Sequence, residues 1–261
     1  MSNHTFPFRL GTTSYIIPDD ILPNAHYLVD KVRDIELVLF EVDDGMNNLP
    51  SLQVVEELIE LARQHDMTYT VHLPLDLKLG DDSSDKDISI IKAKRVIDCT
   101  RELNPWAYVL HLNGRSVKDS KDDKVLSQWQ DQSVQALKIV ADWAGGMEKL
   151  AVENLEGYPV DFIDHVLNRV PVSRCVDIGH LWLDGINPVK YVQAALPRTR
   201  VIHLHGIADR DHRSLAFMPQ EKVQAVLREL IRTNYQGVLT LEVFSQDDFL
   251  SSLNTIEKVL Q

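Results

Sequence analysis

Short apolar runs of strand length alternate with longer amphipathic segments along the whole chain. The strand-like runs contain few polar residues, which is typical of parallel sheets covered on both faces. The amphipathic segments carry apolar residues at helical spacing, as Val55, Leu58 and Ile59 show. The expected strands are 8–14, 35–41, 68–73, 107–112, 149–154, 173–178, 200–205 and 237–244. The expected helices are 19–32, 52–64, 88–103, 125–143, 160–169, 189–196, 220–233 and 247–260.

Eight successive strand-then-helix units with short connections predict a single α/β domain over residues 1–261, folded as a (β/α)8 TIM barrel. A doubly wound open sheet is the alternative. That fold needs a reversal of strand order and commonly has a glycine-rich phosphate loop. Gly145 and Gly146 end a helix and do not form such a loop.

Composition and charge narrow the class of protein. A chain of 261 residues that is 44% hydrophobic can bury one large core. Its net charge of -12 and the absence of a Lys/Arg block make nucleic acid a poor partner. No apolar run approaches the ~20 residues that span a bilayer, and the first residues lack a secretory signal pattern. Cys99 and Cys175 are therefore expected to be reduced thiols in a cytoplasmic protein.

The segment 174–180 places an acid and a histidine at the end of an apolar strand. Asp177 should project past the carboxyl edge of the strand, and the next turn can bring His180 to the same place. Carboxylate oxygen and imidazole nitrogen together suit a divalent ion such as zinc, manganese or iron. The alternative interpretation is that the acid caps the following helix beside a surface histidine.

The same arrangement recurs at other strand ends, where catalytic groups of TIM barrels gather. Alternation along a strand puts His203 and His205 on one face. A lone polar residue at such a position is usually a satisfied core or rim residue, but uncompensated buried carboxylates are costly. A shared cation is the simplest common explanation for the residues that end these strands: Glu41, His72, His111, Glu153, Asp177, His203, His205 and Glu242.

Other features carry less information. Lys78, Arg210 and Arg213 lie in expected loops at the active end, where they can meet an anionic group of a substrate, although surface charge is the more frequent explanation. Trp182 follows His180 and is a further candidate for substrate contact. The chain has no G-x-S-x-G elbow and no plausible Cys–His nucleophile pair.

These motifs together resemble those of the xylose-isomerase-like barrels, a superfamily that includes endonuclease IV and the sugar epimerases. Val152-Glu153-Asn154 looks like its strand-five motif, and Asp177-Ile178-Gly179-His180 looks like its D-x-x-H. Segments 202–205 and 210–215 resemble the strand-seven motif and the run that follows it, and Leu241-Glu242 resembles the last strand. The resemblance covers essentially the whole chain and implies a metal-dependent barrel enzyme.

Two branches of this superfamily differ in their ligands. The epimerases need about four ligands around one ion, with two glutamates that move protons. Endonuclease IV adds histidines on strands three and four and an Asp/His pair after strand seven. The resemblance to endonuclease IV implies one to three ions held by His72, His111, Glu153, Asp177, His180, His203, His205, Asp211, His212 and Glu242. Whether His203 or His205 is the main strand-seven ligand, and whether Asp209 or Asp211 is the loop aspartate, stays open.

A closer resemblance is to the cobamide-remodelling phosphodiesterases of this superfamily. It rests on segments 8–15, 18–24, 71–77 and 239–244. This resemblance implies hydrolysis of the nucleotide-loop phosphodiester of a cobamide, a B12-type corrinoid, to cobinamide phosphate and an α-riboside. Glu153, Asp177 and Glu242 would be the catalytic carboxylates. The alternatives are a metal-dependent sugar isomerase or epimerase and a carrier without turnover. The sequence leaves the native metal, the lower base and the oligomeric state open.

Overall fold

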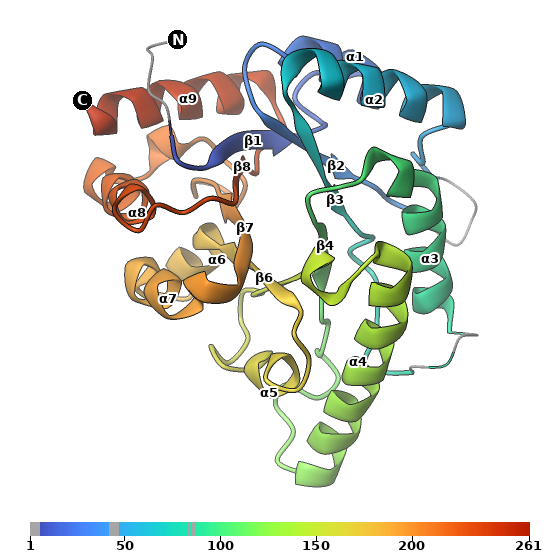
Figure 1. The fold of residues 1–261 in the computed structure, drawn as a ribbon. Helices are drawn as coiled ribbons and strands as arrows, with labels where there is room; N and C mark the ends of the chain where they lie inside the picture. The colour runs from blue at the N-terminus through green and yellow to red at the C-terminus, as the bar shows by residue number, and fades with distance from the viewer. Residues whose placement is uncertain (1–5, 42–46, 83, 85–86) are drawn as a thin grey trace.

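Eight parallel strands close into a barrel in which each strand pairs with its neighbour in sequence and β1 pairs with β8. A computed structural model describes residues 6–41, 47–82, 84 and 87–261. The closed order of the eight strands confirms the predicted TIM barrel (Figure 1). The strands are β1 (Arg9–Thr13), β2 (Asp34–Val38), β3 (Thr68–His72), β4 (Tyr108–His111), β5 (Leu150–Glu153), β6 (Ser173–Asp177), β7 (Thr199–Leu204) and β8 (Val238–Leu241).

Helices cover the outside of the barrel (Figure 1). They are α1 (Ile21–Leu28), α2 (Leu52–His65), α3 (Ile88–Thr100), α4 (Asp123–Ala144), α5 (Asp164–Leu167), α6 (Ile178–Leu183), α7 (Pro188–Ala195), α8 (Gln220–Arg232) and α9 (Gln246–Leu260). Short 3-10 turns lie at Arg101–Leu103, Met147–Lys149, Leu196–Arg198 and Leu215–Phe217. No helix in the described part of the chain is both long enough and apolar enough to span a membrane.

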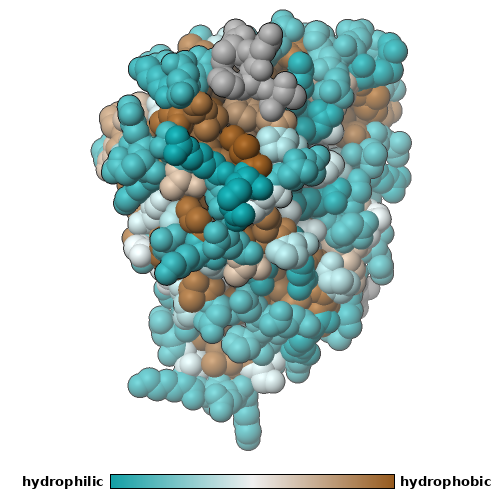
Figure 2. Space-filling model, turned by 60° about the vertical axis from the view of Figure 1, so that its left-hand side comes forward, coloured by the Kyte–Doolittle hydropathy of each residue, from teal (hydrophilic) through white to brown (hydrophobic). Residues whose placement is uncertain are grey.

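The outer surface of these helices is mainly polar. On the face shown in Figure 2, hydrophilic residues predominate and hydrophobic residues occur between them in small groups. The apolar sides of the helices are turned inward, as in α8, where Val223, Val226 and Leu227 are buried against the barrel. This division is what the helical spacing of apolar residues predicts.

Local sequence signals set the ends of several helices. The Ser51 side chain accepts a hydrogen bond from Val54 N at the start of α2, and the Asp87 side chain accepts one from Ser89 N at the start of α3. Helix α4 ends at Gly145, whose φ of 87° is the left-handed conformation that glycine adopts without strain. The caps at Ser51 and Asp87 follow loops that leave β2 and β3 at the carboxyl mouth, whereas Gly145 lies in the turn into β5 at the opposite end of the barrel.

Several elements differ from the sequence prediction. Helix α1 spans Ile21–Leu28 instead of 19–32, and β8 spans Val238–Leu241 instead of 237–244, so Glu242 follows the strand. Strand β2 ends at Val38 because the Asn48 side chain donates to Val38 O and accepts from Phe40 N, which draws the chain out of the sheet. The helix expected over 160–169 shortens to α5, since turns closed by Pro159 O and Asp161 O occupy its first half. Helix α6 was not expected. The acidic loop expected over 81–87 lies partly outside the described residues.

Small side chains fill the barrel interior beneath the polar strand ends. Ala107, Val109, Ala151, Cys175 and Val201 form a separate buried cluster at this level. The strand register then aligns the polar ends above the cluster, with His111 opposite Glu153 and Asp177 opposite His203. The polar strand ends therefore lie on the carboxyl side of this apolar cluster.

Candidate metal centre

One group of donors comes from three neighbouring strands. His72 ends β3, His111 ends β4 and Glu153 ends β5. His72 Nε2 lies 3.4 Å and His111 Nε2 lies 3.2 Å from the same atom, Glu153 Oε2. His72 Nδ1 lies 2.7 Å from Leu73 O, so its proton is placed on Nδ1 and donated to that carbonyl. The lone pair on Nε2 is then available to bind a metal ion. These three residues can hold one cation.

A second group shares Glu153 and adds Asp177, His203 and Glu242. All four side chains are buried. His203 Nδ1 faces the carboxylates, at 3.0 Å from Glu242 Oε2, 3.6 Å from Glu153 Oε2 and 3.9 Å from Asp177 Oδ2. Glu153 and His203 also form a group with Cys175, which lies on the side of the barrel interior. Burial raises the pKa of its thiol well above the usual value.

Glu36 on β2 orients the strand-seven histidine. Its Oε2 lies 2.9 Å from His203 Nε2, and both side chains are fully buried. A proton on Nε2 donated to Glu36 leaves the Nδ1 lone pair directed at the other carboxylates, an arrangement common behind metal-bound histidines. Glu36 was not among the residues predicted from the sequence, because it precedes the expected strand end and its partner is far away in the chain.

A third group contains Asp177, His180, His205 and His212. Asp177 Oδ1 accepts from His180 N at 2.7 Å and lies 3.3 Å from His205 Nε2. Asp177 therefore caps α6, as the alternative interpretation predicts, but His180 is buried and does not lie at the surface. Asp177 also belongs to a group that could hold a cation. The His205 and His212 rings stack with centroids 4.3 Å apart. Both strand-seven histidines enter the centre, His203 in the second group and His205 in the third.

Two small features hold this third group in place. Asn154 joins β5 to β6, since its Oδ1 accepts from Asp177 N at 2.9 Å and its Nδ2 donates to Asp177 O at 3.0 Å. A Cβ on Gly179 would lie 2.1 Å from His205 Cε1, so glycine is required for the histidine ring to pack against the start of α6. The glycine of the D-x-G-H segment is thus explained by a contact with the histidine that follows β7.

The charges of the centre compensate one another. Burial alone raises the pKa of Glu153 and Glu242, but the neighbouring histidines, His203 first, hold the pKa of both carboxyls well below the usual value. Burial lowers the pKa of His203, but Cys175 and then the surrounding carboxylates outweigh burial and raise it. Burial also lowers the pKa of His212, yet the carboxylates, Glu242 first, raise it to about 9. The carboxylates are therefore ionised and depend on nearby positive charge.

Unsatisfied atoms indicate that a cation fits this centre. Asp177 Oδ2, His203 Nδ1, His205 Nε2 and Glu242 Oε2 are buried atoms without a hydrogen-bond partner. Buried polar groups are normally hydrogen-bonded, so four such atoms facing one another require another partner. The donor set of imidazole nitrogen and carboxylate oxygen suits zinc, manganese or iron.

The remaining predicted residues do not belong to the donor groups. Asp211 contacts His212 Nδ1 at 3.2 Å but belongs to none of the donor groups. Arg213 is paired with Asp209 at 2.6 Å. Arg210 and Lys78 are exposed. Trp182 lines a cavity of about 340 Å³ between α6, α7 and α8 that contains none of the predicted metal ligands. Glu41 is buried and paired with Arg95, outside the cluster.

Comparison with known protein families identifies the family of this chain. The family described as "Xylose isomerase-like TIM barrel", which is named for AP endonuclease 2, matches residues 29–260. The chain belongs to this family. No curated protein sequence matches the chain significantly.

Solved structures with the same fold come from several enzymes of different activity. A D-tagatose 3-epimerase-like protein is 18% identical, covers 97% of both chains and has a TM-score of 0.73. The 3-keto-D-glucoside 4-epimerase YcjR of E. coli is 15% identical, covers 97% of this chain and 99% of its own, and has a TM-score of 0.71. Endonuclease IV of Thermus thermophilus is 16% identical, covers 97% and 98%, and has a TM-score of 0.69. At these identities the likeness shows the fold.

Proposed function

We propose that this barrel is a metal-dependent phosphodiester hydrolase. The observation that carries the proposal is the number of contiguous donors. Apart from the set that includes Cys175, they form three overlapping groups joined by Glu153 and Asp177. One ion in an epimerase-type site uses only Glu153, Asp177, His203 and Glu242. The additional histidines His72, His111, His205 and His212 give this centre the capacity for further ions.

More than one ion suits phosphoryl chemistry, because bound cations neutralise phosphate oxygens and lower the pKa of an attacking water. His72 and His111 would hold one ion together with Glu153. Asp177 would be shared between the second and third groups, and His180, His205 and His212 would complete the third. Most of these side chains are buried and only His111 and His212 are half-buried, so their packing keeps their orientation fixed.

Within the chain, individual residues have distinct tasks. Glu36 holds the proton on His203 Nε2 and thereby keeps Nδ1 available. Glu153 and Glu242 stay ionised, since the histidines lower the pKa of each carboxyl. Asn154 fixes the backbone of Asp177 from both sides. Glu153 and Asp177 are the carboxylates placed to orient the attacking water.

The finer proposal for the substrate is a cobamide, whose nucleotide-loop phosphodiester would be cut to give cobinamide phosphate and an α-riboside. It rests on the resemblance of segments such as 71–77 and 239–244 to the cobamide-remodelling phosphodiesterases. In the same proposal, the protein is a cytoplasmic enzyme of one domain, and its substrate is a small molecule.

The test is direct. Purified protein loaded with zinc or manganese is incubated with adenosylcobalamin, and the products are identified by mass spectrometry. Cobinamide phosphate together with the riboside supports the proposal, and both should disappear in the Glu153→Gln variant. An unchanged substrate with every metal tried, or full activity after exhaustive metal removal, refutes it.

The second candidate function is a metal-dependent isomerase or epimerase of sugars or sugar phosphates. The comparisons favour it over hydrolysis, because most of the similar solved structures are sugar epimerases or isomerases. Glu153 and Glu242, two carboxylates of one donor group, would then act as the acid/base pair. Incubation with D-tagatose or D-psicose in deuterated water, followed by NMR, tests it, since epimerisation places deuterium at the substrate carbon.

A further inference from the structure

A cavity of about 460 Å³ opens beside the metal centre on the side of β3, β4 and β5. Two candidate metal ligands, His111 and His180, form part of its wall. Its other lining residues come from the loops after these strands: Leu75, Asp76, Lys78, Asn113, Arg115, Leu155, Glu156 and Tyr158. The volume lies in the range of pockets that hold one small organic group.

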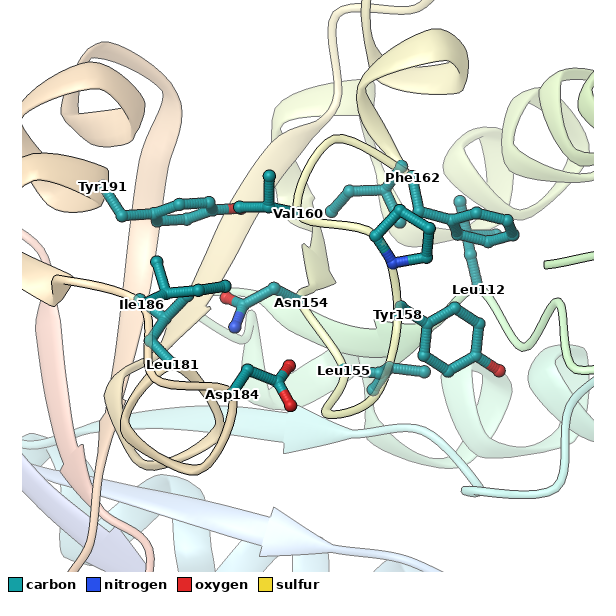
Figure 3. A pocket seen from close by; sticks show the side chains of 12 residues that line it. Leu112, Asn154, Leu155, Tyr158, Val160, Phe162, Leu181, Asp184, Ile186 and Tyr191 are labelled. Atoms are coloured by element: carbon teal, nitrogen blue, oxygen red, sulfur yellow. The ribbon is translucent and has the colours of Figure 1, made fainter. Parts of the chain in front are cut away.

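The loop after β5 forms a firmly held wall of this cavity. Gly157 N donates to both carboxylate oxygens of Asp184 at 3.0 Å, and Gly157 O accepts from Lys118 Nζ at 2.6 Å. Behind the loop the space is almost filled, with about 20 Å³ left among mainly apolar side chains (Figure 3). Because both sides of the loop are fixed, its Leu155 and Tyr158 present a preformed surface.

The chemistry of the walls is divided in two. Leu75, Leu155 and the Tyr158 ring supply apolar and aromatic surface, and the ring also packs against Phe162 with centroids 5.0 Å apart. Glu156 supplies carboxylate oxygens, and Asn113 supplies its amide nitrogen, because Asn113 Oδ1 already accepts from Arg115 N and the Tyr158 hydroxyl. A flat ring joined to a hydroxyl-bearing group fits such a surface, since aromatic side chains bind rings by stacking.

Two cationic side chains, Lys78 and Arg115, line the cavity next to this surface, although the whole protein carries a net charge of -12. Within the described part of the chain, neither Lys78 nor Arg115 forms an ion pair with a carboxylate. Asp76, which also lines the cavity, is neutralised by Lys92 at 2.6 Å. Two exposed cations at the edge of an acidic centre indicate an anionic group in the ligand.

We propose that this cavity receives the nucleoside half of a phosphodiester, with the base against Leu155 and Tyr158 and the phosphate between the metal centre, Lys78 and Arg115. A corrin ring with its side chains is too large for the cavity, so the riboside is the half that fits. The inference rests on the proposed hydrolase function in placing the phosphate at the metal ligands, and it names the part of the substrate that is recognised.

Binding of three probes to the zinc-loaded protein tests the inference by calorimetry: adenosine 5′-monophosphate, ribose 5-phosphate and adenosine. The nucleotide should bind about tenfold more tightly than ribose 5-phosphate, because the base adds a stacking contact. It should also bind about tenfold more tightly than adenosine, because Lys78 and Arg115 add charged hydrogen bonds.

Variants separate these two contributions. Tyr158→Ala should abolish the preference for the nucleotide over ribose 5-phosphate, and Tyr158→Phe should keep it. Tyr27→Ala is the matched control, since Tyr27 is half-buried and lies under Lys31 as Tyr158 lies under Lys118. The double change Lys78→Ala and Arg115→Ala should reduce the preference over adenosine, leaving the part that the metal centre contributes, whereas Arg169→Ala should not change it.

Equal binding of the three probes, or a preference that survives Tyr158→Ala, overturns the inference even where cobamide is hydrolysed. A preference for the nucleotide that disappears in Tyr158→Ala supports it. If that pattern holds while no phosphodiester is cleaved, the proposed function fails and the recognition of a nucleotide remains. The two failures are therefore distinguishable.

Discussion

His203 Nε2 lies 2.9 Å from Glu36 Oε2, across the fully buried interior of the barrel. The same imidazole directs Nδ1 towards Glu153, Asp177 and Glu242. One carboxylate behind the ring thus decides which nitrogen faces the metal centre.

We expect Glu36→Gln to weaken metal binding by about 10- to 100-fold, the range found when such outer partners are removed. The neutral amide no longer favours the tautomer with its proton on Nε2. Chelator competition gives the affinity, and nitrogen-15 NMR of the histidine rings gives the tautomer. Glu41→Gln is the control, because Glu41 is also buried but pairs with Arg95 outside the centre. Equal affinities in both variants would contradict the assignment.

Gly179→Ala should damage the third donor group selectively. The new Cβ would lie 2.1 Å from Cε1 and 2.2 Å from Nε2 of His205, so the ring has to move. We expect a loss of about 1–3 kcal/mol in the free energy of unfolding from this overpacking, together with a lower metal content. Thermal unfolding and elemental analysis measure both. In a protein that already carries His205→Ala, Gly179→Ala should cost much less stability than it does in the wild type, because the ring is absent. An equal cost in both backgrounds would exclude the contact with the His205 ring as the cause.

The histidines on β3 and β4 distinguish the two proposed functions. His72→Gln combined with His111→Gln removes two of the three donors of the first group but leaves Asp177, His203 and Glu242 in the second. A hydrolase that uses several ions should lose one ion per chain and at least about tenfold in rate. An epimerase with one ion should keep its rate. Metal content by mass spectrometry and assays with both substrates decide between them.

The metal-free protein should lose stability as the pH rises from neutral to alkaline. The pKa of His212 is raised from 6.5 to about 9, so the folded state holds this proton more tightly than the unfolded state. Its contribution is complete below pH 6.5 and is lost as the pH rises to about 9. For a side chain that is 20% exposed, the contribution is at most about 3 kcal/mol.

Chemical unfolding of the metal-free protein at pH 6.5 and at pH 9 measures this effect, and His212→Gln should reduce the difference. Bound metal should reverse the trend, because cations replace the protons on the imidazoles and bind more tightly as the pH rises. A metal-free protein that is equally stable at both pH values would contradict the compensation between the carboxylates and His212.

Much of the barrel and many of the donors follow from local patterns. Each strand that ends in a polar residue places it at the carboxyl mouth, because parallel strands of one barrel end on the same side. Residues such as His111 and Glu242 could therefore be singled out without coordinates. Helix α6 could not, since its six residues form a short segment capped by Asp177 and carry too little periodicity to detect.

The sequence by itself determined the order of the strands and of the helices other than α6, the closed barrel and the collection of histidines and acids at one mouth, because alternation and strand ends are local properties of the chain. The tertiary structure alone decided how these donors divide into three groups, which nitrogen of His203 faces inward, and why Gly179 is required. Glu36 and His203 are 167 residues apart, and contacts of that kind arise only when the barrel closes.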